Sequence, residues 1–451
     1  MGYRIEKDSI GEIRVPSEHK WGAQTERSRQ NFKIGQHLMP MPVVEGLIEI
    51  KRAAAIVNYQ MSKLPKDKSD AIVEACDEIL AGKWPNEFPL NVFQTGSGTQ
   101  SNMNTNEVIA HLCQEKGVDI HPNDDVNMSQ SSNDTFPTAM HIAGLKELQP
   151  LLVELDEWIT LLEKLEIENK DIIKIGRTHL QDATPLTFGQ EISGWKTMIQ
   201  KAKTFILSSS QSLNYLTIGG TAVGTGLNAP KGFDVAMANE IANHTDLPFE
   251  TEENKFYGLT SYSGLSFTHG ALRTLASDLM KIANDIRWLA SGPRAGLGEI
   301  TIPANEPGSS IMPGKVNPTQ SEALTMVVCQ VMGNDTTIQV ASSQGNFELN
   351  VFKPVMIYNF LDSVTLLHDG MKSFRENCLV GVKANIEAMD LLMQRSLMLV
   401  TALSPYIGYE NCATVAKFAH KENLSLEEAV VTLGFATKEE FSQWVKPEEM
   451  I

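Results

Sequence analysis

The amino-acid sequence is poor in positive charge and has no long apolar run. Its 451 residues include 38 Lys and Arg against 55 Asp and Glu, which gives a formal net charge of −17. This balance, and the lack of any Lys- or Arg-rich run with interleaved aromatic residues, argues against nucleic-acid binding. Charged or strongly polar residues interrupt every apolar stretch, so the sequence predicts no membrane span.

Cysteine is also scarce. The five cysteines are odd in number and widely spaced, and no two of them form a Cys-x-x-Cys motif. Free thiols in a reducing compartment are the simplest explanation of this pattern. The first residues, Met1 to Glu6, contain no apolar signal core. We therefore expect a cytoplasmic protein.

The length of the chain suggests about three domains. Alternating apolar and polar residues over 3–15 predict a short β-hairpin that turns at Asp8–Gly11. Helical periodicity follows at about 43–59, 69–80 and 103–116. From about residue 385 the pattern changes to short helices. We expect an N-terminal, mostly helical domain with the hairpin (1–130), a central long-helix bundle (131–384) and a small C-terminal helical domain (385–451).

The central region carries the clearest periodic signal. Apolar residues recur there in alternating steps of three and four, which is typical of long helices in an antiparallel bundle. The three stripes are Leu145, Leu148, Leu152, Leu155, Ile159 and Leu162; Phe188, Ile192, Trp195, Ile199, Ala202 and Ile206; and Leu272, Leu275, Leu279, Ile282, Ile286 and Leu289. A helix that follows Pro318 is apolar on most faces, which favours burial on every side. We therefore expect an oligomer whose core contains helices from different subunits.

The segment Gly308–Pro318 is the most informative stretch. Its prolines and glycines exclude regular helix or strand. Ile311, Met312 and Val316 offer apolar anchors, so we interpret the segment as an ordered functional loop. Asn317-Pro318 is typical of a helix start, whose partial positive charge favours an anion. The loop presents two hydroxyls, one ammonium and one carboxamide, from Ser309, Ser310, Lys315 and Asn317.

This loop has two other interpretations. A surface turn with a chance lysine fits the segment equally well when it is taken alone. A nucleotide-binding P-loop does not fit, because five residues rather than four separate Gly308 from Gly314-Lys315. Val316 also stands where a P-loop needs Ser or Thr to bind magnesium. The sequence thus indicates a loop that binds an anion but lacks the P-loop motif for nucleotide phosphates.

Other polar segments are individually less specific. Gln94–Asn102 and Ser129–Asp134 lead into expected helices, where hydroxyl and amide side chains could hold an anion, although an ordinary N-cap cluster explains each segment alone. Gly176–Pro185 is expected as a loop before a long helix. It contains His179, and a lone histidine is more often structural than catalytic.

Two further segments have no clear ligand. Gly219–Gly226 lacks the strand-turn-helix setting of a dinucleotide site, so we predict a tight loop packed against backbone. His121–Asp125 offers one histidine and two acids without a spaced partner, which favours a solvated turn over a metal site.

Together these polar loops on a helical scaffold resemble the class II fumarases of the fumarase/aspartase superfamily. The resemblance runs nearly end to end, from Trp21–Thr25 to Trp444–Glu448. The pattern Gly-Ser-Ser-Ile-Met-Pro-x-Lys-Val-Asn-Pro at 308–318 is highly specific for the superfamily. Gly314 and the following Thr319–Glu322 resemble fumarases, where aspartases typically carry alanine and a different tail. Met128 departs from the pattern, since relatives often have lysine there.

The resemblance implies an activity and roles for individual residues. Similar enzymes reversibly add water across fumarate to give L-malate, a step of the citric acid cycle, through an aci-carboxylate and without metal or organic cofactor. It implies that Ser309 is the base, that His179 is the acid/base on the water side, and that Glu322 orients His179. Lys315 counts among the catalytic residues, as a source of positive charge. The residues implied to hold the substrate carboxylates are Ser97, Thr99, Ser131, Ser132, Asn133, Thr178, Ser310, Lys315 and Asn317. A second, accessory anion site would include His121, Asn123 and Asp124.

The resemblance also implies an all-α subunit with three domains and a central five-helix bundle. Four subunits would form a common helical core, and each site would combine loops of three chains. Two alternatives remain at this point. One is an aspartate ammonia-lyase-like enzyme on the same scaffold, and the other is a non-enzymatic homo-oligomer, which would lack part of the Ser309, His179 and Lys315 set.

Overall fold

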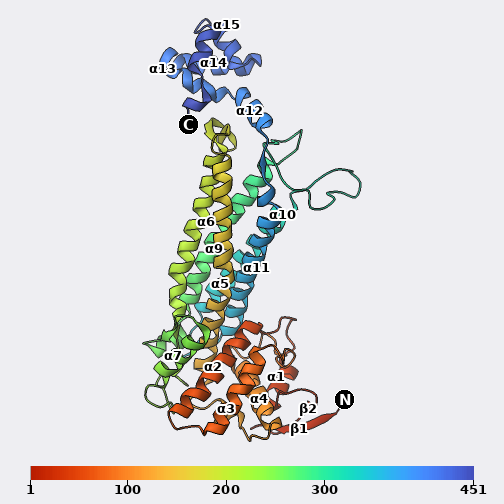
Figure 1. Ribbon diagram of the computed structural model, residues 1–451, viewed down its shortest axis with the longest axis vertical. Coiled ribbons are helices and arrows are strands. Elements are labelled where there is room, and N and C mark those ends of the chain that lie inside the picture. The colour runs from red at the N-terminus through yellow and green to blue at the C-terminus, as the bar shows by residue number, and fades with distance from the viewer. Residues whose placement is uncertain (1) are drawn as a thin grey trace. The chain divides into compact units, whose positions relative to one another are not determined.

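The computed structural model describes residues 2–451 and consists mainly of helices (Figure 1). Five of the helices are long, and the first three of them carry the apolar stripes of the central region. They are α5 (Ser132–Glu168), α6 (Phe188–Ser210), α9 (Ser263–Leu289), α10 (Thr319–Ser342) and α11 (Lys353–Asn377). The all-α prediction is confirmed. No helix among residues 2–451 combines the length and the apolar character that crossing a membrane requires.

The remaining elements are shorter. The other helices are α1 (Ala23–Asn31), α2 (Met41–Gln60), α3 (Lys66–Leu80), α4 (Thr99–Glu115), α7 (Phe233–Thr245), α8 (Lys255–Thr260), α12 (Ile386–Arg395), α13 (Ser404–Ile407), α14 (Tyr409–Glu422), α15 (Leu426–Thr432) and α16 (Lys438–Trp444). Two-residue strands pair β5 (Tyr215–Leu216) with β6 (Glu250–Thr251) and β7 (Ile300–Thr301) with β8 (Lys383–Ala384).

The chain divides by its internal contacts into two compact units. Unit 1 comprises Met1–Leu152, Ala202–Ala276 and Cys329–His368, and unit 2 comprises Val153–Lys201, Ser277–Val328 and Asp369–Ile451. Each long helix contributes residues to both units. The division into three consecutive domains stays a prediction.

The predicted stripes form the helix core of both units. Every stripe residue of α6 and α9 is buried, and so are four of the six stripe residues on α5. In unit 2 the ring of Trp158 on α5 stacks on that of Phe374 on α11, with centroids 5.6 Å apart. In unit 1 the His269 imidazole on α9 lies 2.8 Å from Asp335 on α10 and 2.8 Å from Ser363 on α11. The stripes therefore face neighbouring helices within each unit, as bundle packing requires.

The N-terminal hairpin is confirmed. Strands β1 (Tyr3–Lys7) and β2 (Glu12–Pro16) pair antiparallel, with Tyr3 opposite Pro16. The Asp8 carboxylate accepts hydrogen bonds from the backbone of Ile10 and Gly11, which closes the turn, and it also accepts from Arg27 on α1.

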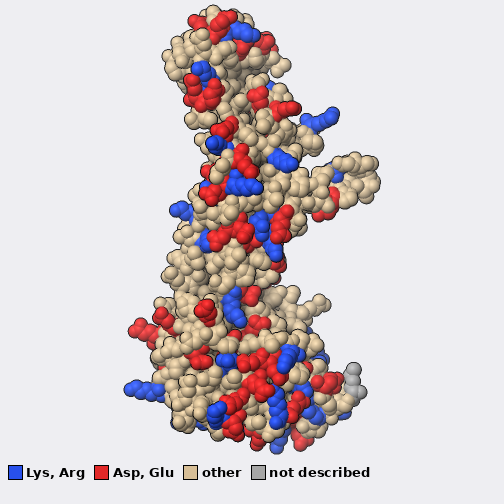
Figure 2. Space-filling model, in the orientation of Figure 1, with Lys and Arg blue, Asp and Glu red and all other residues tan. Residues whose placement is uncertain are grey.

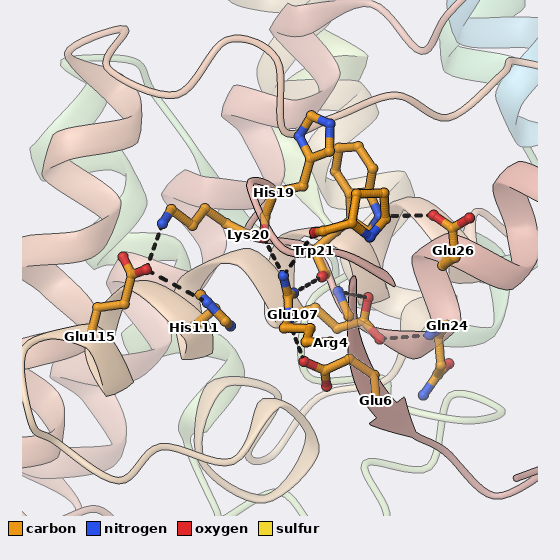
Figure 3. A network of polar contacts seen from close by, with 12 residues as sticks. Arg4, Glu6, His19, Lys20, Trp21, Gln24, Glu26, Glu107, His111 and Glu115 are labelled. Atoms are coloured by element: carbon orange, nitrogen blue, oxygen red, sulfur yellow. Dashed lines mark hydrogen bonds and ion pairs between the residues drawn. The ribbon is translucent and has the colours of Figure 1, made fainter. Parts of the chain in front are cut away.

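A buried carboxylate joins α1 to α4 (Figure 3). Glu107 on α4 accepts hydrogen bonds from the backbone N–H groups of Gly22 (2.9 Å), Gln24 (2.8 Å) and Thr25 (3.1 Å), and from the Thr25 hydroxyl (2.6 Å). These donors are the unpaired groups at the start of α1, so Glu107 serves as a cap supplied from a distant helix. Burial raises the pKa of Glu107, and the four hydrogen bonds oppose that effect. The contact fixes α4, whose N-terminus carries the first candidate site residues.

The short helices expected after residue 385 are confirmed as elements. In unit 2 they enclose a small apolar core of their own that includes Leu403, Val415, Ala419, Ala429 and Val430. Capping boxes at Ser425 and Thr437 open α15 and α16, with the side chains of Glu428 and Glu440 bonding back to the cap backbone.

Candidate active site

The predicted site residues of unit 1 lie at the starts of α4 and α5. Helix α4 begins at Thr99, four residues earlier than the sequence pattern indicated. The residue before it, Gly98, adopts a left-handed conformation (φ 78°), which glycine tolerates and which allows the helix to start there. The hydroxyls of Ser97 and Thr99 lie 2.8 Å apart. A Cβ atom on Gly96 would fall 1.4 Å from the Val351 carbonyl oxygen, so this turn requires glycine there.

The second segment, Ser131–Asn133, opens α5 next to the first. The Asn102 amide on α4 donates to the Ser132 hydroxyl (3.1 Å), which ties the two helix starts together. The Asn133 backbone N–H donates to the Ser131 hydroxyl (3.2 Å). The structure therefore brings together the hydroxyls and amides predicted to bind carboxylate. Two neighbouring helix N-termini add partial positive charge, which favours an anion.

The glycine-rich segment Gly219–Gly226 packs against the start of α5, as predicted for a tight loop. The Asp134 carboxylate accepts hydrogen bonds from the backbone N–H groups of Gly219 (3.0 Å) and Thr221 (2.8 Å). The Asn133 amide donates to the Ala222 carbonyl (2.8 Å). A Cβ atom on Gly219 would lie 2.9 Å from the Asp234 Cα atom, so the close approach needs glycine. The loop thus holds Asn133 and Asp134 in position.

The accessory residues lie in an exposed turn beside this region. The turn Pro122–Val126 is a single π-helical turn, where His121 Nδ1 accepts from the Asp124 backbone N–H (3.1 Å). Asn123 and Asp124 line a cavity of about 630 Å³ that also contains Met128 and Ser131. Among residues 2–451, no group of three or more His, Cys, Asp or Glu side chains is arranged to hold a metal ion.

In unit 2 the structure corrects the expected loop at Gly176–Pro185. This segment belongs to an antiparallel hairpin of β3 (Ile173–Thr178) and β4 (Gln181–Thr187). His179 and Leu180 form its two-residue turn, with φ 58° and 60°. Two positive φ values are typical of a type I′ turn. The hairpin could not be predicted from the sequence because such turns usually contain Asn-Gly or Asp-Gly. Here two non-glycine residues adopt the left-handed conformation.

Ion pairs anchor this hairpin in unit 2. Arg177 on β3 forms a bidentate ion pair with Glu299, with N–O distances of 2.7 and 3.2 Å. Lys174 Nζ lies 3.6 Å from the same carboxylate and 2.9 Å from that of Glu191 on α6. Glu299 is fully buried. The anchored strands project the exposed Thr178 and His179 at the tip of the hairpin.

The loop Gly308–Pro318 closes on itself. The Gly308 N–H donates to the Lys315 carbonyl (2.8 Å), and the Asn317 amide donates to the Gly308 carbonyl (2.8 Å). The Ser309 hydroxyl oxygen accepts from the backbone N–H groups of Ile311 (3.3 Å) and Met312 (3.1 Å). Helix α10 begins at Thr319, so Asn317 closes the loop with its side chain instead of capping the helix.

The expected apolar anchors of this loop are not buried within the chain. Ile311 is 83 % exposed, Met312 49 % and Val316 47 %. Figure 1 shows the segment before α10 leaving the helices of unit 2 as an extended loop. Its order therefore rests on the internal hydrogen bonds, and its apolar side chains are free to contact another subunit.

The predicted site residues of unit 2 are not hydrogen-bonded to one another in the described part of the chain. Within unit 2, no hydrogen bond or ion pair between residues described by the structure joins His179 to Ser309 or Glu322, and His179 and Glu322 are exposed. Lys315 and Ser310 are exposed as well. The unit 1 residues are tied together directly, whereas the unit 2 residues lie on two separate exposed elements, the hairpin tip and the loop.

The sequence interpretation missed three buried charged residues near the unit 1 group. These are Lys51 on α2, Asp134 on α5 and Lys353 on α11, all fully or almost fully buried. Lys51 could have been found, because it interrupts an apolar helix face between Leu47 and Ala54. Asp134 and Lys353 carry no comparable local signal.

On the face of the molecule drawn in Figure 2, charged side chains of both signs occur side by side. A local source of positive charge is therefore needed to hold an anion in a chain of charge −17.

Comparison with known proteins assigns this arrangement to a family. A family model described as "Lyase" matches residues 11–333, and one described as "Fumarase C C-terminus" matches residues 399–451. The chain is 58 % identical over 461 residues to the fumarate hydratase class II of Bacillus subtilis (strain 168), covering 100 % of this chain and 99 % of that protein. It is 59 % identical to the corresponding protein of Bacillus cereus, with the same coverage.

Similar solved structures support the same family. A class II fumarase from Schistosoma mansoni superposes with a TM-score of 0.97 at 43 % identity, covering 100 % of this chain and 99 % of that one. A Brucella melitensis protein described as fumarate lyase:delta crystallin bound to cobalt superposes with a TM-score of 0.95 at 38 % identity, also over 100 % of this chain. The family expected from the sequence is confirmed: the chain belongs to the class II fumarate hydratases.

Proposed function

We propose that this protein is a hydro-lyase that interconverts fumarate and L-malate. The observation that carries the proposal is identity of 58 % to a fumarate hydratase class II over the whole chain, combined with the intact Gly308–Pro318 loop. The ammonia-lyase alternative is not favoured by these relatives.

The chemistry of dehydration explains what the site residues must do. Removing the C–H proton beside a carboxylate of L-malate leaves an aci-carboxylate, so charge develops on a substrate that is already a dianion. In our proposal that proton passes to the Ser309 oxygen. The C–O bond then breaks, and the leaving hydroxide takes a proton from His179 to depart as water. Glu322 orients His179, and Lys315 with Asn317 stabilises the developing charge.

The activation of Ser309 follows from its loop. A serine hydroxyl is a poor base, so its alkoxide form needs stabilisation. The backbone N–H groups of Ile311 and Met312 both point at the Ser309 oxygen. Donors aimed at an oxygen favour its negatively charged form. Lys315, on the same closed loop, supplies a positive charge for the same purpose.

The substrate carboxylates are held, in the same proposal, by the residues at the starts of α4 and α5 together with Thr178, Ser310, Lys315 and Asn317. Hydroxyls, amides and helix N-termini suit a small dianion. We propose that the accessory residues His121, Asn123 and Asp124 form a second anion site, whose Asn123 and Asp124 line the cavity that also contains Ser131. We place the enzyme in the cytoplasm, because all five cysteines are free.

A parallel assay tests the activity. L-malate and L-aspartate are supplied separately with a chelator present, and the ultraviolet absorption of the fumarate double bond is followed. We expect absorption to rise with L-malate alone. Signal from L-aspartate alone would overturn the hydratase assignment in favour of an ammonia-lyase. A malate signal that appears only when the chelator is left out would contradict a metal-free reaction.

We further propose that the active form is a homotetramer with sites shared between subunits. Exposed apolar side chains on α9 and α10 support this, because Phe267 is 66 % exposed, Met326 67 % and Val340 58 %. Such a surface is typical of a subunit interface. The exposure of His179 at the hairpin tip, without a hydrogen bond to Ser309 among the described residues of unit 2, supports it as well. Sedimentation at equilibrium should give four times the 49.7 kDa subunit mass, and a monomer with full activity would contradict the proposal.

A further inference from the structure

Lys353 is buried beside the unit 1 site without a hydrogen-bond acceptor. It is the first residue of α11, its side chain is 0 % exposed, and its Nζ atom has no hydrogen-bond partner in residues 2–451. Its backbone N–H donates to the Gly96 carbonyl (3.2 Å). Lys353 therefore lies directly against the turn that carries Ser97 and Thr99.

Few charged groups act on the Lys353 ammonium. Asp134 on α5 is the charged group that acts on it. The Asp134 carboxylate is itself held by three backbone N–H groups, those of Ser131 (2.9 Å), Gly219 and Thr221. Asp134 also acts on Lys51 of α2, which faces Cys76 of α3, and on Lys255 of α8, which faces Asp234 and Glu252.

Lys51 and Lys255 differ from Lys353 because they have acceptors. Lys51 Nζ donates to the Asn127 (2.9 Å) and Gln130 (2.8 Å) side-chain oxygens. Lys255 Nζ donates to the Leu216 carbonyl (3.0 Å) and the Thr251 hydroxyl (2.6 Å). A buried ammonium without acceptors is unfavourable unless a ligand supplies them.

We propose that Lys353 is a positioning residue for the dicarboxylate substrate, whose buried ammonium provides positive charge for the carboxylate held at the starts of α4 and α5. This inference rests on the proposed function. It accounts for the attraction of a dianion by a chain of net charge −17, since the positive charge lies beside the proposed carboxylate position.

The proposal predicts that binding of the dianion depends on pH. Burial lowers the pKa of Lys353 from 10.5 to about 7, and Asp134 opposes this effect. Without ligand, the positive charge is therefore lost as the pH rises through about 7. A bound dianion favours the charged form, so binding above this pH must take up a proton. Affinity should then fall by up to about tenfold per pH unit above neutrality.

The test measures binding of succinate, a dicarboxylate that cannot be hydrated or dehydrated, to the assembled full-length protein. Calorimetry at pH 6.5 and 8 in two buffers of different ionisation enthalpy gives the affinity and the protons taken up. At pH 8 we expect the unaltered protein to take up close to one proton. Lys353→Met should abolish most of this uptake and weaken binding at pH 6.5 by about tenfold or more.

Three further variants make the result specific. Lys353→Arg keeps the charge at every pH, so it should bind succinate with little dependence on pH. Lys51→Met removes a second lysine whose pKa is lowered by burial to about 7. Proton uptake on succinate binding should persist in this variant. Lys421→Met changes the net charge equally at an exposed position (81 %) and should behave like the unaltered protein.

Each outcome decides the question. Unchanged affinity and proton uptake in Lys353→Met would overturn the inference, as would loss of uptake in Lys51→Met. If Lys353→Met does not assemble, the pH dependence of the unaltered protein and its disappearance in Lys353→Arg decide. An unaltered protein that neither binds succinate nor converts L-malate would instead refute the proposed function.

Discussion

Replacing Ser309 by alanine is expected to abolish turnover of L-malate, by about 10³-fold or more, while the fold and the proposed tetramer persist. The variant removes the oxygen that takes the C–H proton in our proposal, and among the described residues no neighbouring hydroxyl accepts from the same two N–H groups. Initial rates of fumarate formation give the loss. Thermal unfolding and sedimentation show whether fold and assembly are kept.

A matched variant separates catalysis from loop structure. The Ser309 oxygen also stabilises its loop by accepting from the Ile311 and Met312 N–H groups, so alanine removes both roles. An asparagine side chain can accept from the backbone two residues ahead. Ser309→Asn should therefore preserve the turn and still be inactive. Near-normal activity in either variant would remove Ser309 from the role of base.

His179→Asn is expected to lower kcat by about 10²- to 10³-fold. Asparagine tolerates the left-handed conformation that residue 179 adopts (φ 58°), so the hairpin turn should be retained. It cannot exchange a proton with the leaving hydroxyl. Steady-state kinetics with L-malate measures the effect, and circular dichroism verifies that the helical fold is intact.

Leu180 supplies the control for this variant. It lies next to His179 in the same turn, has φ 60° and is 69 % exposed. Leu180→Gly removes a side chain from a left-handed position, where a non-glycine residue costs about 1 kcal/mol. Activity should stay within a few-fold of normal and the hairpin should not be weakened. If Leu180→Gly lost as much activity as His179→Asn, turn geometry rather than proton transfer would explain both.

The helices were predictable from sequence because their signal is local. The stripe of Phe188, Trp195 and Ile206 repeats with the period of a helix, and its burial follows from that period alone. The irregular structure of Gly308–Pro318 was predictable for a similar reason, since its prolines and glycines exclude regular helix or strand.

Features that depend on distant parts of the chain were not predictable. The requirement for glycine at 96 arises from the Val351 carbonyl, which is far away in sequence. The hairpin turn at His179 lacks the residues that usually mark it. Ile311 and Val316 were expected to anchor their loop, but an apolar residue alone does not reveal whether its partner lies in the same chain or in another. The burial of Lys353 depends likewise on several separate segments.

The interleaving of the two units has a consequence for how the chain folds during synthesis. Unit 1 includes residues 329–368, so it cannot be completed until most of the polypeptide has left the ribosome. Until then α5, α6 and α9 expose apolar stripes whose partners are not yet made. Nascent chains with such unpaired surfaces are prone to aggregation. We therefore expect the nascent chain to depend on chaperones for longer than a chain of consecutive domains of equal length.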